Sequence, residues 1–201
     1  LGYTNMLTAL DLAGIALHAD KRGDDDPIVI AGGHAAFNPE PISRFIDAAV
    51  LGDGEQAALD ITDCIAEFKA DGSPGGRAAL LGRQGEVEGV YVPSFYDVDY
   101  LPDGRIHRVV PNRPEAPWRV AKRTVMDLDE WPYPKAPLVP LAETVHERSS
   151  VEIFRGCTRG CRFCQAGMIT RPVRERSIET VGQIIASGLA KTGFDEVGLL
   201  S

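Results

Sequence analysis

The feature that most constrains this chain is a short glycine-rich loop that contains three cysteines. The stretch RGCTRGCRFCQAG, residues 155–167, places Cys157, Cys161 and Cys164 within eight positions. The glycines of the loop allow the backbone to turn tightly enough for three sulfurs to converge on one object. With only Cys64 elsewhere in the chain, the cluster favours a metal or redox site in a reducing compartment over a disulfide scaffold.

The segments on either side of the loop predict where it lies in a fold. The run SVEIF before it is typical of a strand, and Ser177 is a helix N-cap with Glu179 in the first turn. Gly193 ends that helix, and EVGLLS begins another strand. This is one βαβ unit with the cysteines in its first βα loop, at the strand end where α/β barrels hold their active sites.

The first third of the chain predicts alternating helices and strands. A helix beginning near Thr4 precedes IVIAGG, and a short helix over PISRFIDA precedes AVLGDGE. A further helix spans Glu55–Lys69, and Cys64 on it is interpreted as a packing residue. This alternation predicts an α/β fold, with residues 1–72 forming the second half of a doubly wound domain.

Residues 73–150 are predicted to be a linker. The composition changes at DGSPGG, and YDVDYLPDGRIHRVV then predicts a β-hairpin turning at Asp103-Gly104. Six prolines between Asn112 and Pro140 predict an extended connector with little regular structure. Residues 151–201 begin the next domain. Because the chain starts within a helix-rich pattern and stops inside a strand, we expect a fragment at both ends.

Charge is distributed unevenly along the chain. The 201 residues carry a formal net charge of −8, which is not typical of a generic nucleic-acid binder. Residues 1–72 hold 13 acidic and 4 basic side chains, whereas residues 155–176 hold six arginines and one glutamate. The positive loop would stabilise an anionic thiolate cluster and a carboxylated ligand docked on it. The sequence contains no run of about 18 apolar residues, so a transmembrane helix is not expected. A cytoplasmic location is expected.

Three thiolates leave more than one metal site open. Structural zinc takes four ligands, and a ferredoxin-type 4Fe–4S cluster also takes four from the protein. His146 is the histidine closest to the loop in sequence. A 4Fe–4S cluster on three cysteines would leave one iron open to a substrate or cofactor. The alternative is a non-catalytic metal-binding module, with zinc or a ferredoxin-like cluster serving structure or electron transfer.

The segment FRGCTRGCRFCQAG resembles the signature of the radical S-adenosylmethionine (SAM) superfamily, C-x3-C-x-aromatic-C, with Phe163 at the aromatic position. The resemblance implies a partial TIM-type barrel in which Cys157, Cys161 and Cys164 bind a 4Fe–4S cluster. It implies that SAM chelates the fourth iron and that Phe163 packs near the SAM adenine. One-electron reduction, by a reductant such as flavodoxin or ferredoxin, would cleave SAM to start radical chemistry on a small-molecule or macromolecular substrate.

The upstream segments IAGGHAAFNPEP and DAAVLGDGEQ resemble the latter half of the cobalamin-binding-like domain that precedes many radical SAM barrels. The resemblance implies a cofactor site at the carboxyl ends of the two strands. The chain lacks the D-x-H-x-x-G motif through which a histidine ligates cobalt. Any cobalamin is therefore expected to bind without a protein histidine on cobalt, and an empty domain is the other possibility.

Overall fold

The computed structural model describes residues 2–142 and 144–200. Within it the chain forms two compact units, Leu1–Thr124 and Val125–Ser201. Both units mix helices and strands, which confirms the α/β class predicted from the sequence. The cysteine loop belongs to the second unit, and both glycine turns that resemble a cobalamin-binding domain belong to the first.

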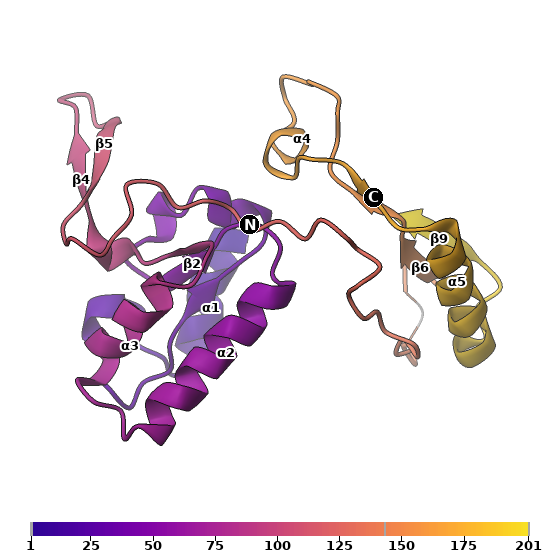
Figure 1. The fold of residues 1–201 in the computed structure, drawn as a ribbon, viewed down its shortest axis with the longest axis horizontal. Coiled ribbons are helices and arrows are strands. Elements are labelled where there is room, and N and C mark those ends of the chain that lie inside the picture. Colours follow the sequence, from indigo (N-terminus) through magenta and orange to yellow (C-terminus); the bar gives the residue numbers. More distant parts are fainter. Residues whose placement is uncertain (1, 143, 201) are drawn as a thin grey trace. The chain divides into compact units, whose positions relative to one another are not determined.

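The first unit is built on a small mixed sheet (Figure 1). Strand β1 (Ile30–Ala31) pairs in parallel with β2 (Ala48–Val50), and β3 (Val90–Tyr91) runs antiparallel to β2. The helices of this unit are α1 (Gly2–Leu12), α2 (Glu55–Ala70) and α3 (Gly76–Gly85), with short 3-10 turns at Ala19–Lys21, His34–Phe37, Glu40–Ile42 and Pro93–Phe95.

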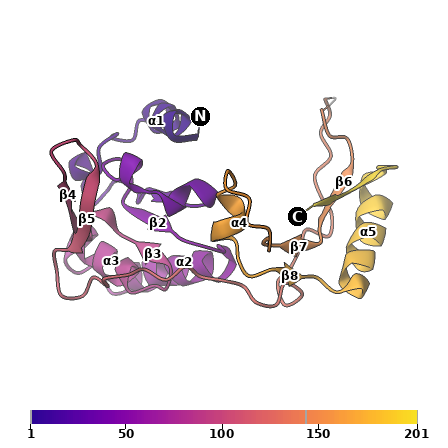
Figure 2. The same ribbon diagram turned by 90° about the horizontal axis from the view of Figure 1, so that it is seen from above.

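Helices cover both faces of this sheet. Successive strand residues point to opposite faces, so Ala48 packs in one buried cluster with Ile61 of α2, and Ala49 packs in a second with Ile42 and Ile46. Figure 2 shows α1 on one side of β2, with α2 and α3 on the other. The predicted parallel pair covered on both faces is confirmed, and the antiparallel third strand was not foreseen.

Two local predictions for the first unit are wrong. The short α-helix expected over residues 41–48 is a 3-10 turn at Glu40–Ile42 followed by a bend into β2. Ile42 and Ile46 are buried without an α-helix, because the chain already enters β2 at Ala48. Conversely, α3 forms inside the expected linker. It begins after Gly75 at φ 78°, and it buries Leu80 and Gln84. Burial against α2 and the sheet outweighs the helix-breaking glycines around it.

The predicted hairpin is confirmed. Strands β4 (Tyr96–Tyr100) and β5 (Ile106–Pro111) pair antiparallel, with Tyr96 opposite Pro111. Gly104 turns at φ 83° beside Asp103, whose carboxylate accepts a hydrogen bond from the Arg105 backbone N–H (3.1 Å). The turn chemistry read from the sequence therefore fixes this element locally.

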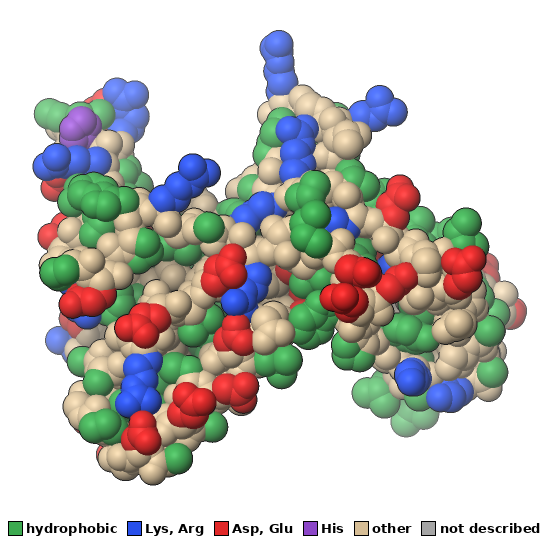
Figure 3. Space-filling model, viewed as in Figure 1, with side chains coloured by type: hydrophobic (Ala, Val, Ile, Leu, Met, Phe, Trp, Pro, Cys, Tyr) green, Lys and Arg blue, Asp and Glu red, His purple; other side chains and the backbone are tan. Residues whose placement is uncertain are grey.

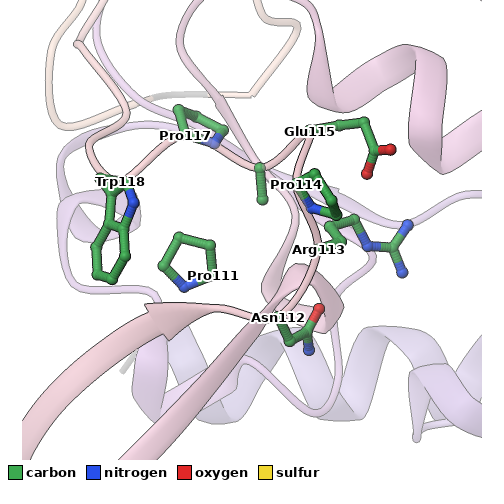
Figure 4. A pocket seen from close by; sticks show the side chains of 8 residues that line it. Pro111, Asn112, Arg113, Pro114, Glu115, Pro117 and Trp118 are labelled. Carbon is green, nitrogen blue, oxygen red and sulfur yellow. The ribbon is translucent and has the colours of Figure 1, made fainter.

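The proline-rich connector after the hairpin has no helix or strand among its described residues between Pro111 and Ser149, as predicted. Its first part nevertheless folds back on the core. Ala116 is buried, Tyr96 donates a hydrogen bond to the Pro117 carbonyl (2.8 Å), and the Arg113 guanidinium lies 3.7 Å from the Phe95 ring centroid. This part of the connector lines a hollow of about 530 Å³. Figure 4 shows the proline rings and the Trp118 indole around it.

The second unit contains the predicted βαβ unit. Strands β6 (Ser149–Glu152) and β9 (Val197–Leu200) pair in parallel, joined through α5 (Ile178–Thr192). The Ser177 hydroxyl accepts a hydrogen bond from the Thr180 N–H (3.1 Å), so Ser177 is the N-cap expected. A Cβ on Gly188 would lie 2.8 Å from the Ser149 hydroxyl, which shows how closely α5 approaches β6.

Candidate functional site

The cysteine loop is closed at its base by a pair of short strands. Strand β7 (Phe154–Arg155) pairs antiparallel with β8 (Arg174–Glu175), and the single-turn helix α4 (Ala166–Ile169) lies between them. The loop therefore begins and ends at one point, between β6 and α5. The predicted placement of the cysteines in the first βα loop is confirmed.

Gly156 is the residue at which the chain enters the loop from β7. Its φ is 92°, a region that L side chains rarely adopt. A Cβ there would lie 2.4 Å from the Pro172 carbonyl oxygen and 2.9 Å from that of Thr170. The two limbs of the loop thus pack backbone to backbone, and only glycine fits between them.

Two of the three cysteine sulfurs accept backbone hydrogen bonds. The Arg159 N–H donates to Cys157 Sγ and the Gly167 N–H donates to Cys164 Sγ, both at 3.4 Å. Both thiols are partly buried, whereas Cys161 is exposed. Backbone N–H groups directed at sulfur are the outer contacts that metal-ligating cysteines commonly make.

Gly167 separates the two partly buried cysteines. A Cβ on Gly167 would lie 3.7 Å from Cys157 Cβ and 3.8 Å from Cys164 Sγ. Cys157 and Cys164 therefore flank a common point. Across residues 2–142 and 144–200, however, no three Cys, His, Asp or Glu side chains already form a group that could hold a metal ion. Three soft thiolate donors fit an iron–sulfur cluster, and the assignment of Cys161 as the third ligand stays a prediction.

Arginine side chains fasten the loop to its surroundings. Arg171 donates to the carbonyls of Cys157 and Arg159, both at 3.1 Å. Arg174 is 5% exposed and donates to the carbonyls of Val125, Thr170 and Pro172, at 2.9–3.1 Å. These charged hydrogen bonds to backbone oxygens hold the loop in shape.

Glu152, at the end of β6, lies between two further arginines. Its carboxylate pairs with Arg155 Nε at 2.7 Å and with an Arg176 NH at 3.2 Å. Burial by itself would raise the pKa of this carboxyl, but the hydrogen bonds and charges of Arg155 and Arg176 outweigh burial and lower the pKa. The group is therefore held ionised as an anchor beneath the loop.

The tip of the loop presents cationic and aromatic side chains to solvent. Arg159 and Arg162 are exposed, and the Phe163 ring is 93% exposed. Figure 3 shows Lys and Arg side chains standing out from the surface over α4, while acidic side chains gather over α2. The charge asymmetry of the sequence thus becomes a positive loop tip beside the cysteines. The predicted contact of Phe163 with SAM stays a prediction.

The fourth cysteine, Cys64, and the histidine closest to the loop in sequence, His146, are not part of the cysteine loop. Cys64 is partly buried on α2, in the first unit, and burial raises the pKa of its thiol. Such a thiol stays protonated and is a poor ligand. His146 is exposed, with its Nδ1 3.0 Å from a guanidinium nitrogen of Arg148.

A cavity of about 750 Å³ in the first unit lies near the amino ends of β1 and β2. Its wall includes the buried Asp47, whose Oδ2 accepts hydrogen bonds from Arg22 (2.8 Å), Arg77 (2.7 Å) and the Val29 N–H (2.7 Å). Other donors of the two arginines bind backbone carbonyls of residues 16–27 and 45. This cluster fixes the loop before β1 to the start of β2.

Several residues that shape the site were not identified from the sequence. The β7–β8 pair, the burial of Arg174 and the double pairing of Glu152 depend on contacts between distant segments. One signal was available, because Glu152 and Arg155 are three residues apart and of opposite charge. Leu128 is buried, and its carbonyl accepts a hydrogen bond from Arg176. Its apolar side chain was the one feature of the sequence that could have predicted this burial.

Comparison with known proteins adds independent support. Residues 1–93 match the family model described as "Radical SAM proteins, N-terminal". A stretch of 93 residues, 46% of this chain, is 36% identical to the ribosomal protein uS12 methylthiotransferase RimO of a Thermotoga species. Over residues 1–93 the chain is therefore similar to the N-terminal part of radical SAM proteins. The family-model match lies outside residues 155–167, so it is separate from the resemblance of the cysteine segment.

A second relative is an uncharacterized protein of Methanocaldococcus jannaschii, 24% identical over 184 residues, which is 90% of the chain. The chain spans 33% of that relative's length and 17% of the RimO protein's. No solved structure matches. Among the described residues, no helix combines the length and apolar character needed to cross a membrane.

Proposed function

We propose that this chain supplies the N-terminal domain and the cluster-binding segment of a radical SAM enzyme. Cys157, Cys161 and Cys164 would hold a 4Fe–4S cluster and leave one iron for the amino and carboxylate groups of SAM. When bound, the cluster and SAM supply one-electron reductive cleavage of SAM, with flavodoxin or ferredoxin as the source of electrons. A cytoplasmic setting, where thiols stay reduced, suits this chemistry.

The observation that carries the proposal is the spacing of three thiols in one closed loop at the end of β6. Backbone N–H groups already face Cys157 and Cys164, and these donors would stabilise the charge of ligated thiolates. Arg171 and Arg174 hold the loop backbone through carbonyl oxygens. The βαβ unit of β6, α5 and β9 would then be the first unit of a partial TIM-type barrel.

Phe163 and the exposed arginines have separate parts in the proposal. The Phe163 ring stands in solvent one residue before Cys164, and we assign it to the adenine of SAM. Arg159 and Arg162 would attract a carboxylated or otherwise anionic ligand to the loop tip. The βα loop of a barrel strand is where such ligands converge.

The test is anaerobic reconstitution of the full-length protein with iron and sulfide. About four irons per chain are expected, and SAM should alter the electron paramagnetic resonance spectrum of the reduced cluster. Cys161→Ala should lose most of the iron, whereas the matched Cys64→Ala should keep it. Stoichiometric zinc without iron in anaerobically isolated protein would favour the non-catalytic module instead.

A further inference from the structure

The carboxyl end of β2 is where a doubly wound domain would bind a cofactor. The turn Gly52–Gly54 follows β2 there, and Gly32-Gly33 follows β1 at the same edge. Resemblance to a cobalamin-binding domain predicts a ligand across these two turns. The turn after β1 is exposed, but the turn after β2 is covered by another part of the chain.

The covering segment is centred on Arg123, near the end of the first unit. The Arg123 N–H donates to the Leu51 carbonyl, and the Asp53 N–H donates to the Arg123 carbonyl, both at 2.9 Å. These bonds form a parallel bridge between Gly52 and Arg123. The connector thus pairs, through this single bridge, with the residues just beyond the carboxyl end of β2.

Two glycines make room for this segment. Gly52 has φ 104°, and a Cβ on it would lie 2.0 Å from the Arg123 carbonyl oxygen. Gly89 has φ 84°, and a Cβ on it would lie 3.0 Å from the Leu51 carbonyl oxygen and 3.3 Å from Arg123 Cβ. Gly52 and Gly89 are therefore needed for close approach of the chain's own backbone.

Carboxylates hold the Arg123 side chain. Its guanidinium is paired with Asp60 of α2 and lies 3.6 Å from a Glu88 oxygen, and the side chain is 16% exposed. Hydrogen bonds from Gln56 and then from Arg123 lower the pKa of Asp60. We call the set Leu51–Asp53, Asp60, Glu88, Gly89 and Arg123 the Arg123 clasp.

We infer that the Gly52–Gly54 turn is a binding site for the chain's own connector and that the domain takes no cobalamin there. A corrinoid resting on both glycine turns would have to displace two backbone hydrogen bonds and the ion pairs of Arg123. Nothing in this inference depends on the cysteine cluster, so it stands or fails separately from the proposed enzyme activity.

Hydrogen exchange on the full-length protein tests the clasp. The amide of Arg123 should be protected in the wild type, because its N–H is bonded to Leu51. Gly52→Ala should raise exchange across residues 119–126 by about tenfold or more, since the new Cβ cannot coexist with the Arg123 carbonyl. Gly54→Ala is the matched control. Gly54 has φ −91° and open space at its Cβ position, so exchange there should not change.

A second variant and a ligand test complete the experiment. If Gly52→Ala fails to fold, Arg123→Ala removes the ion pairs and should raise exchange in the same peptide, whereas the exposed Arg119→Ala should not. Wild-type protein incubated with hydroxocobalamin and desalted should retain none by its visible spectrum. Stoichiometric retention would overturn the inference, as would equal exchange in Gly52→Ala and Gly54→Ala.

Discussion

Replacing Gly156 by alanine should open the cysteine loop. A left-handed backbone costs an L residue about 1–2 kcal/mol, and the new Cβ would lie 2.4 Å from the Pro172 carbonyl oxygen. Backbone atoms cannot rotate away as a flexible side chain can, so the β7–β8 closure must shift. We expect a total cost of about 3 kcal/mol to the closed loop, which is about a hundredfold in its population.

The matched control is Gly160→Ala in the same loop. A Cβ on Gly160 meets no atom within 4 Å, and its φ is not in the left-handed range. After anaerobic reconstitution, Gly156→Ala should bind less than about half of the wild-type iron, while Gly160→Ala should bind the wild-type amount. Wild-type iron content and thermal stability in Gly156→Ala would refute the reasoning, because the backbone approach would then have no role in cluster binding.

Three further predictions concern stability. Gln84 is fully buried on α3, and neither of its amide atoms has a hydrogen-bond partner among the described residues. Gln84→Met should therefore raise the free energy of unfolding, measured in urea, by about 1–2 kcal/mol. A decrease of that size would contradict this prediction. Ser177→Ala removes the N-cap of α5 and should cost about 1 kcal/mol, seen as faster amide exchange in its first turn; unchanged exchange would count against the cap. Because the pKa of Glu152 is lowered in the folded state, its stabilising effect is present above the ordinary value of 4.5 and is lost as the pH falls below it. Glu152→Gln should accordingly lower the melting temperature at pH 7 and converge with wild type once the pH falls below the lowered pKa of Glu152. A difference that stays constant as the pH falls would exclude the ion pairs as its cause.

Local chemistry allowed much of the fold to be predicted from the sequence. The hairpin followed from Asp103-Gly104, and α5 followed from Ser177 and Gly193, because a turn or a cap acts on residues only a few positions away. The βα position of the three cysteines followed in the same way from the strand and helix that flank them. The radical SAM resemblance also rested on residues within one short segment.

The rest depended on contacts between distant segments. The glycine-rich composition before α3 predicted a linker. The helix forms because it packs against α2 and the sheet, and local composition carries no information about that contact. The Gly-Asp-Gly turn was predicted to line a cofactor site. Only the tertiary structure shows that Arg123, some 70 residues later, packs against this turn. Sequence thus determined which residues are candidate metal ligands and where the chain turns at glycine. Tertiary structure decided which backbone occupies the space those glycines leave, because that depends on segments brought together by burial.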